Sequence, residues 1–183
     1  WPFQQDLIRG LVDNRFCIVK SPRQSGKSQT SLAYMLHYVL FHEQRNIAIL
    51  ANKGATAREL LGRIQMAYER LPMFIQQGVS EWNKGSIYLE NGSRILASST
   101  TSSAIRGFSF NLIFLDEFAF VQQNMAEEFF NSVYPTISSG KTSQVIIVST
   151  PNGMNHFYKM WTNATENRSD YKAFSVNWWD VPG

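Results

Sequence analysis

The sequence predicts an α/β fold in which helices surround a mostly parallel β-sheet that carries an inserted β-hairpin. Short apolar runs alternate with amphipathic segments along the chain, which is typical of βαβ units. Several of these runs are almost wholly apolar, as expected for strands that are covered on both faces. The pair Asn91-Gly92 stands between two alternating runs, and this is the strongest short signal for a hairpin.

The first half of the chain predicts two strand–helix units. RFCIVK at 15–20 predicts a strand, and a helix is expected over 26–41. NIAILA at 46–51 predicts a second buried strand. Apolar residues then recur at helical spacing over 55–71, and Pro72 ends that helix because it cannot continue the hydrogen-bond ladder.

The second half predicts the hairpin and the remaining strands. SIYLENGSRILASS alternates around its Asn-Gly turn, and NLIFL and SQVIIVS are short apolar runs typical of covered strands. Two amphipathic segments between and after them predict helices. The expected elements are a hairpin at 86–99, strands at 111–115, 143–149 and 171–178, and helices around 124–134 and over 153–164.

Length and composition indicate one soluble globular domain. The chain has 183 residues, of which 44% are hydrophobic and 17% charged, and its net charge of +3 is compatible with a polyanionic partner without requiring one. Cys17 is the only cysteine, which excludes an internal disulfide. The longest apolar run, 31–41, is too short to span a bilayer. Because the chain begins at Trp1 and shows no signal peptide, we expect 1–183 to be a single-domain fragment of a longer intracellular protein.

The segment KSPRQSGKSQ at 20–29 matches a phosphate-binding loop, G-x-x-x-x-G-K-[ST], except that Ser21 replaces the first glycine. Gly26 allows close approach of the backbone, Lys27 supplies charge, and Ser28 supplies a hydroxyl for Mg²⁺. Taken alone, the segment is also compatible with a strand-to-helix turn that carries an unrelated lysine. The residues expected to contact nucleotide are Ser21, Pro22, Arg23, Gln24, Ser25, Gly26, Lys27, Ser28 and Gln29.

A second motif, NLIFLDEFAF at 111–120, is typical of a Walker B element. Asp116 and Glu117 come at the carboxyl end of a strand, where open α/β sheets bind their ligands. Asp116 would bind Mg²⁺, and Glu117 would orient and deprotonate the attacking water. Two acids that merely cap a strand are the alternative, but their occurrence together with the phosphate loop favours a nucleotide hydrolase.

A third candidate segment is STPNG at 149–153. We expect it at the end of a strand between the two motif-bearing strands, where its polar groups could sense the γ-phosphate. The alternative is a simple β-turn at Pro151-Asn152-Gly153.

These segments together resemble the ATPase domain of the large terminase of tailed bacteriophages, most closely that of T-even-like phages. The segments that carry the resemblance span nearly the whole chain: FQQDLI, SPRQSGKS, WNKGSIYLENGS, IRGFSF, DEFAF and STPNGMNHFYKMW. The resemblance implies a RecA-like P-loop NTPase of the additional-strand, catalytic-glutamate class. It also implies ATP and Mg²⁺ as cofactors, and ATP hydrolysis that drives double-stranded DNA into a viral procapsid.

The resemblance further implies partners and a location. The partners would be double-stranded DNA, the portal protein and the small terminase subunit, with no membrane involved. The chain would form a homo-oligomeric ring on the portal, although the isolated fragment would be monomeric. It would act in the cytoplasm of the infected host, transiently on the procapsid, and be absent from the mature virion. The nuclease domain of such proteins would follow Gly183, so no nuclease activity is expected here.

Roles for further residues also follow from the resemblance. FQQ at 3–5 resembles an adenine-reading Q motif, so Gln4, or alternatively Gln5, would contact the base and Phe3 would stack on it. Arg23 would donate charge to the phosphates. The coupling motif is matched by Ser149, Thr150 and Pro151.

Two sets of basic residues are candidates for transition-state and DNA contacts. An arginine beside the transferring phosphoryl group accelerates the reaction roughly 10³–10⁵-fold. Arg23 would act within one subunit, whereas Arg106 would reach a neighbouring subunit or else bond nearby carbonyls as a structural arginine. Candidate DNA contacts are Lys53, Arg58, Lys84 and Arg94, for which a solvated surface charge is the alternative.

Two other functions remain open from the residues. DEFA is similar to a D-E-A-D box and STP to the third helicase motif, so a superfamily-two-type helicase or translocase lobe is the main alternative. A nucleotide-dependent interaction module without hydrolysis is the other, and Glu117 argues against it.

Overall fold

The computed structural model describes residues 1–100, 108–132, 135, 137 and 142–181. Its helices are α1 (Pro2–Asp13), α2 (Lys27–Phe41), α3 (Gly54–Glu69), α5 (Gln123–Ser132) and α7 (His156–Thr165), with short 3-10 turns η1 (Phe118–Phe120) and η2 (Trp178–Asp180). Its strands are β1 (Phe16–Lys20), β2 (Asn46–Ala51), β3 (Val79–Trp82), β4 (Ser86–Leu89), β5 (Arg94–Ser99), β6 (Leu112–Asp116), β7 (Gln144–Ser149) and β8 (Lys172–Ser175).

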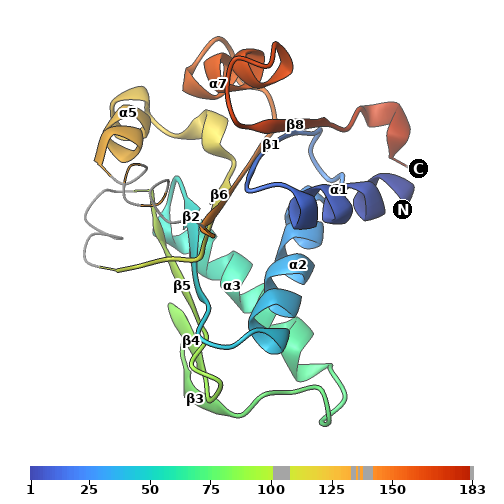
Figure 1. The fold of residues 1–183 in the computed structure, drawn as a ribbon, viewed down its shortest axis with the longest axis vertical. Coiled ribbons are helices and arrows are strands. Elements are labelled where there is room, and N and C mark those ends of the chain that lie inside the picture. The colour runs from blue at the N-terminus through green and yellow to red at the C-terminus, as the bar shows by residue number, and fades with distance from the viewer. Residues whose placement is uncertain (101–107, 133–134, 136, 138–141, 182–183) are drawn as a thin grey trace.

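The strands form one sheet in the order β3-β4-β5-β2-β6-β7-β1-β8 (Figure 1). All pairings from β5 to β8 are parallel, whereas β3–β4 and β4–β5 are antiparallel. The predicted mostly parallel sheet with an inserted hairpin is therefore confirmed. Strand β5 of the hairpin joins the parallel part of the sheet, and β4 extends it outward.

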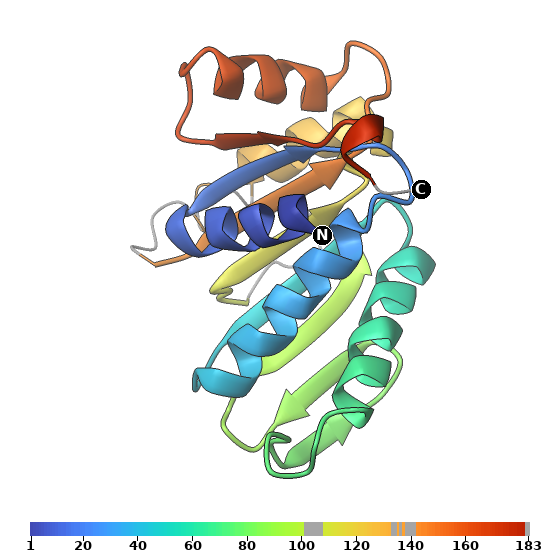
Figure 2. The ribbon, with the colours of Figure 1, turned by 90° about the vertical axis from the view of Figure 1, so that its right-hand side faces the viewer.

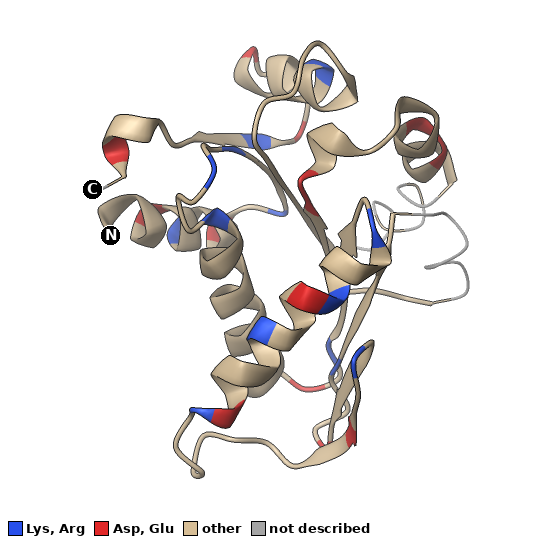
Figure 3. Ribbon diagram, turned by 180° about the vertical axis from the view of Figure 1, so that it is seen from behind, with Lys and Arg blue, Asp and Glu red and all other residues tan. Residues whose placement is uncertain are grey.

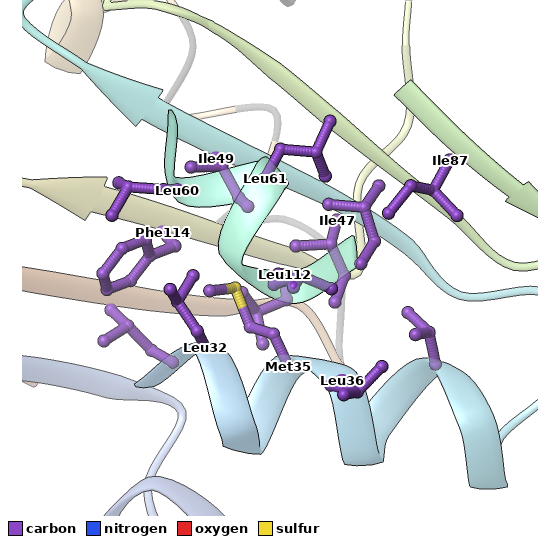
Figure 4. Close-up of a cluster of buried hydrophobic side chains, with 14 of the residues drawn as sticks. Leu32, Met35, Leu36, Ile47, Ile49, Leu60, Leu61, Ile87, Leu112 and Phe114 are labelled. Atoms are coloured by element: carbon purple, nitrogen blue, oxygen red, sulfur yellow. The ribbon is translucent and has the colours of Figure 1, made fainter. Parts of the chain in front are cut away.

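Helices cover both faces of the sheet, so the central strands are buried on both sides. On one face, Cys17 and Val19 pack with α1, α2 and α3, which lie in front of the sheet in Figure 2. The alternate residues Phe16 and Ile18 belong to a second cluster, with side chains from η1, α5 and α7. Figure 4 shows the first cluster, in which Met35 of α2 lies among side chains of the neighbouring elements. This double covering explains why the strands are continuous apolar runs.

Three features differ from the sequence-based expectations. Helix α1 was not anticipated, although Leu7 and Leu11 repeat at helical spacing and are buried. Strand β3 was not anticipated either. Its residues are mostly exposed and show no apolar alternation, and its only pairing among the described strands is with β4. The last strand, expected over 171–178, is only Lys172–Ser175 and is followed by η2.

The topology brings the three motif segments to one edge of the sheet. Strand β7 lies between β6 and β1, as the sequence predicted. The register pairs Lys20 with Ser149 and Asp116 with Val148, so these strands end at the same level. Parallel strands with aligned carboxyl ends create the crevice in which α/β proteins bind ligands. Within the part of the chain that the structure describes, none of the helices has the length and apolar character that crossing a membrane requires.

Candidate active site

The loop between β1 and α2 has the left-handed residues that a phosphate-binding loop requires. Gln24 has φ 59° and Gly26 has φ 79°, and α2 begins directly afterwards. Ser21, which replaces the first glycine of the motif, is buried, and its hydroxyl hydrogen-bonds that of Ser25. The Ser21 backbone N–H also donates to the Ser149 carbonyl at 3.2 Å. The loop is therefore closed by a serine–serine contact at the position where the motif has glycine.

Position 26 requires glycine for two reasons, its backbone conformation and the close approach of the Gln4 side chain. Its φ is one that residues with a Cβ rarely adopt. A Cβ at this position would also lie 2.6 Å from the Gln4 amide nitrogen. Gln4 therefore reaches the phosphate loop from α1. Phe3 is half-buried, whereas Gln5 is exposed.

The phosphate loop and the acidic pair converge. The Lys27 ammonium lies 2.9 Å from the Glu117 carboxylate, in an ion pair whose lysine is buried. The Ser28 hydroxyl donates to the Asp116 carboxylate at 2.9 Å, across 88 residues of sequence. Lys27, Asp116 and Glu117 line one cleft, and Ser28 is hydrogen-bonded to Asp116 at its edge.

Burial and hydrogen bonding shift the pKa values of the two acids in opposite directions. Burial raises the pKa of Asp116, and the adjacent Glu117 charge raises it further, against the lowering effects of the Ser28 hydrogen bond and the Lys27 charge. Burial also opposes ionisation of Glu117, but hydrogen bonds from Lys27 and Thr150 outweigh it, so the net pKa of Glu117 is lowered. Glu117 is therefore held as a carboxylate at neutral pH, as a general base must be.

Glu117 is held by the STPNG segment as well as by Lys27. Its second carboxylate oxygen accepts hydrogen bonds from the Thr150 N–H at 3.1 Å and the Thr150 hydroxyl at 2.9 Å. The Ser149 hydroxyl lies 3.4 Å from the same oxygen. Pro151 is exposed. Two of the three residues that were expected to act in coupling, Ser149 and Thr150, thus contact the expected base directly.

A cleft of about 420 Å³ opens beside these groups. The Arg23 guanidinium lies 5.9 Å from the centre of the Phe120 ring at its wall. A second hollow, of about 360 Å³, is lined by the phosphate loop and by Arg63 of α3. The lining residues of the first cleft are Arg23, Gln24, Lys27, Ala51, Asn52, Lys53, Thr56, Asp116, Glu117 and Phe120.

The oxygen donors of the site fit Mg²⁺. Mg²⁺ in nucleotide sites is held by one or two protein oxygens, and phosphates and water complete its shell. The adjacent Ser28 hydroxyl and Asp116 carboxylate are such donors. Among the described residues, no group of three or more His, Cys, Asp or Glu side chains forms a metal cluster of another kind.

The four candidate DNA contacts do not lie on one continuous surface. Lys53 and Arg58 are exposed at the start of α3, near the cleft, and Figure 3 shows further basic positions along that helix, mixed with acidic ones. Lys84 is exposed in the turn between β3 and β4. Arg94 pairs in register with Asn46 at the opposite edge of the sheet. The Arg94 guanidinium packs 4.9 Å from the Phe108 ring, as expected of a partly structural side chain.

Sequence reasoning missed several residues at the site. Arg63 lies beside the phosphate loop, but only the packing of α3 against α2 brings it there. Asn152 and Asn155 bond the turn that follows Glu117. An asparagine before a helix is a capping signal, so Asn155 could have been anticipated as the N-cap of α7. Arg106 lies outside the described residues.

Comparison with known proteins identifies the family of this chain and shows which solved structures share its fold. The family model for the N-terminal region of T4-like terminase large subunits matches residues 18–180. Among solved structures, the chain is similar to a variant of the ATPase domain of the large terminase from Thermus phage P74-26. The sequence identity is 21% and the TM-score 0.79, over 98% of this chain and 82% of that chain.

Two structures of large terminases give the same fold, and this chain covers a smaller share of each of them. The HK97 bacteriophage large terminase is 18% identical, with a TM-score of 0.81 over 97% of this chain and 39% of that chain. The large terminase from the thermophilic bacteriophage D6E in complex with ADP is 12% identical, with a TM-score of 0.70 over 96% and 44%. The RecA-like architecture that the resemblance implied is thereby confirmed. The chain spans less than half the length of these two proteins.

Proposed function

Because the chain belongs to the family of T4-like terminase large subunits, whose N-terminal region it matches, we propose that it is an ATP-hydrolysing motor domain for packaging double-stranded DNA. One observation carries the proposal. The buried Lys27 ammonium and the Glu117 carboxylate meet at 2.9 Å at the edge of the sheet, beside the Ser28–Asp116 pair. This is the combination of charge, metal ligand and base that hydrolysis of a triphosphate requires.

The phosphate loop would bind the triphosphate through its backbone N–H groups and the start of α2, where the helix dipole favours negative charge. Lys27 would leave Glu117 and bind the outer phosphates, because a phosphate carries more charge than one carboxylate. Ser28 and Asp116 would hold Mg²⁺, which supplies positive charge to the phosphate oxygens when bound. Gln4, whose amide lies beside Gly26, would contact the base.

Glu117 would then accept a proton from the attacking water. Its lowered pKa keeps it ionised at neutral pH, and Thr150 fixes one of its oxygens, so the other is available once Lys27 has moved. Arg23, at the wall of the same cleft, would stabilise the charge that develops on the γ-phosphoryl group. The role of Arg106 towards a neighbouring subunit stays a prediction.

The motor would work within a larger assembly. We propose that residues 1–183 are the ATPase domain of a longer chain, that it forms a ring on the portal protein, and that the small terminase subunit presents the DNA. It would act in the cytoplasm of the infected bacterium, transiently on the procapsid, and not remain in the mature virion. Lys53, Arg58 and Lys84 are the proposed DNA contacts, and Arg94 is a weaker candidate because it is packed against Phe108.

ATP turnover of the chain tests the enzymatic part of the proposal. We expect phosphate release in the presence of Mg²⁺ that EDTA abolishes. Lys27→Ala should prevent turnover and weaken nucleotide binding. Glu117→Gln should lower kcat by about 10²–10⁴-fold, the usual contribution of a general base, without abolishing binding.

One control variant and two contrary outcomes sharpen this test. Arg9→Ala, in an exposed pair with Asp6, should leave kcat and KM unchanged. Normal turnover by Glu117→Gln would contradict the assignment of the base. Strand separation by the wild-type chain, without movement along duplex DNA, would instead favour the helicase alternative.

A further inference from the structure

The geometry points to a positioning role for Asn155 and Asn152, whose side chains fix the turn after Glu117 and so aim its carboxylate at the phosphates. This inference rests on the proposed ATPase function, because it concerns the same site. The two asparagines lie after the coupling residues and have no expected contact with nucleotide.

The backbone at Glu117 is in a conformation that needs external support. Glu117 has φ 48° and ψ 44°, in the left-handed region that side chains with a Cβ disfavour. Such a conformation persists only where the surrounding structure enforces it, and it is frequent at functional sites. The 3-10 turn η1 follows directly, so the contacts of η1 hold the backbone from which the Glu117 side chain reaches Lys27 and Thr150.

Ala119 in this turn is held on both sides of its backbone. Its N–H donates to the Ser149 hydroxyl at 3.0 Å. Its carbonyl accepts from the Asn155 amide at 2.6 Å and from the Asn152 amide at 3.2 Å. Ala119 is buried, and its bond to Ser149 is buried with it, whereas the bonds to the half-buried Asn155 and the exposed Asn152 lie at the boundary with solvent.

The Asn155 side chain forms hydrogen bonds with its oxygen as well as with its nitrogen. Its oxygen accepts from the Tyr158 N–H and caps α7, while its nitrogen also donates to the Asn152 carbonyl at 2.8 Å. One side chain thus joins the turn after Glu117 to the start of α7. We infer that the backbone of this turn stays fixed while the Glu117 carboxylate exchanges Lys27 for water.

Two substitutions separate this contact from the helix cap. Asn155→Ser and Asn155→Asp each keep an oxygen that can cap α7, because Ser, Asp and Asn are similar N-caps. Neither offers an amide N–H to the Ala119 carbonyl. We expect kcat for ATP to fall about tenfold or more, since a misplacement of about 1 Å in a reacting group can cost roughly 100-fold.

The KM for ATP should change much less than kcat, because the phosphate loop is untouched. Asn163→Ser, in the exposed part of the same helix, is the matched control and should leave both constants unchanged. Asn152→Ala alone should have a small effect. Combined with Asn155→Ser, it should lower kcat by more than the product of the single effects, because both amides serve one carbonyl.

The outcomes distinguish this inference from the proposed function. If the wild type hydrolyses ATP and Lys27→Ala does not, but both Asn155 variants keep wild-type kcat, the positioning role is wrong and the ATPase assignment stands. An equal loss in Asn163→Ser would also overturn the role, because it would reflect general loosening of α7. No turnover by the wild type would overturn both proposals. Thermal unfolding confirms that each variant is folded, and Asn155→Asp carries the test if Asn155→Ser does not fold.

Discussion

At the scale of single residues, opposite pKa shifts give two adjacent acids different roles. Asp116 is 5% exposed, and its charge is costly to bury, whereas Glu117 is held ionised by Lys27 and Thr150. Perturbed pKa values cluster at functional sites, and environments that separate the pKa values of two neighbouring acids commonly give those acids different roles. The sequence predicted both roles from the motif, and the structure adds the physical difference between the two acids, which is the opposite direction of their pKa shifts.

The buried charge of Asp116 is expected to lower the stability of the fold, although the proposed Mg²⁺ site needs that charge. Because its pKa is raised in the folded protein, its contribution to stability is present below the ordinary value of 3.8 and is lost as pH rises through the raised pKa. Asp116→Asn keeps an acceptor for Ser28 without the charge. At pH 7 and without Mg²⁺, it should therefore raise the midpoint of thermal unfolding by a few degrees.

Differential scanning calorimetry with and without Mg²⁺ and ATP provides the measurement. The advantage of Asp116→Asn should shrink as pH falls towards 3.8. Mg²⁺ and ATP together should stabilise the wild type and not the variant. A variant that melts at or below the wild-type temperature at pH 7 would show that the Asp116 charge is not a burden on the fold.

At the scale of elements, the phosphate loop depends on its backbone as much as on its charges. Ser21 and Ser25 close the loop, and Gly26 starts α2 in a left-handed conformation beside Gln4. The sequence marked the substitution of Ser21 as a departure from the motif. The structure gives it a role, since its hydroxyl and N–H both bond neighbouring segments.

Gly26→Ala should therefore weaken both folding and nucleotide binding. A Cβ in the left-handed region costs about 1–2 kcal/mol, and here it would also displace the Gln4 amide. We expect a loss of this size in the free energy of unfolding from urea denaturation, with weaker binding of ATP by calorimetry. Gly62→Ala is the matched control, because that position is helical with open space around it. It should stabilise the protein by up to about 1 kcal/mol, and equal behaviour of the two variants would contradict the argument.

Element prediction succeeded for the central strands and their helices, but it missed α1 despite its helical spacing and β3, which has no pattern of its own. The central strands and α2 and α3 fall within a few residues of their expected ranges, because each has an apolar pattern of its own. Strand β3 lacks such a pattern, since it is defined by pairing with β4 at the edge of the sheet. Helix α7 begins later than expected because Asn155 caps it after the STPNG loop.

At the scale of the whole molecule, the ligand crevice and two of the proposed DNA contacts, Lys53 and Arg58, lie at the carboxyl edge of the sheet. Lys53 lines the cleft that also contains Glu117, and Arg58 follows one turn along α3. The bound phosphates would therefore lie close to the basic side chains of Lys53 and Arg58. Arg94, at the opposite edge, does not belong to this surface.

Loss of Lys53 or Arg58 should change DNA binding in a defined way. Each phosphate contact that is lost should reduce the dependence of log affinity on log salt by about 0.9, with no change in sequence preference. Fluorescence anisotropy with duplex DNA at several salt concentrations measures this slope. Arg70→Ala, at the other end of the same helix, is the matched control and should keep the wild-type slope. Equal slopes for all variants would exclude these two side chains from the DNA contact.

The sequence by itself determined the α/β class, the main strands and helices, and the two motifs whose side chains meet at the site. These follow from local periodicity and from residue types at fixed spacing, which short stretches of chain carry alone. Only the tertiary structure decided that Lys27 pairs with Glu117, that Thr150 holds the same carboxylate, and that Asn155 reaches Ala119. Those contacts join segments far apart in the chain, and they depend on strand register and loop closure, which no short stretch of sequence encodes.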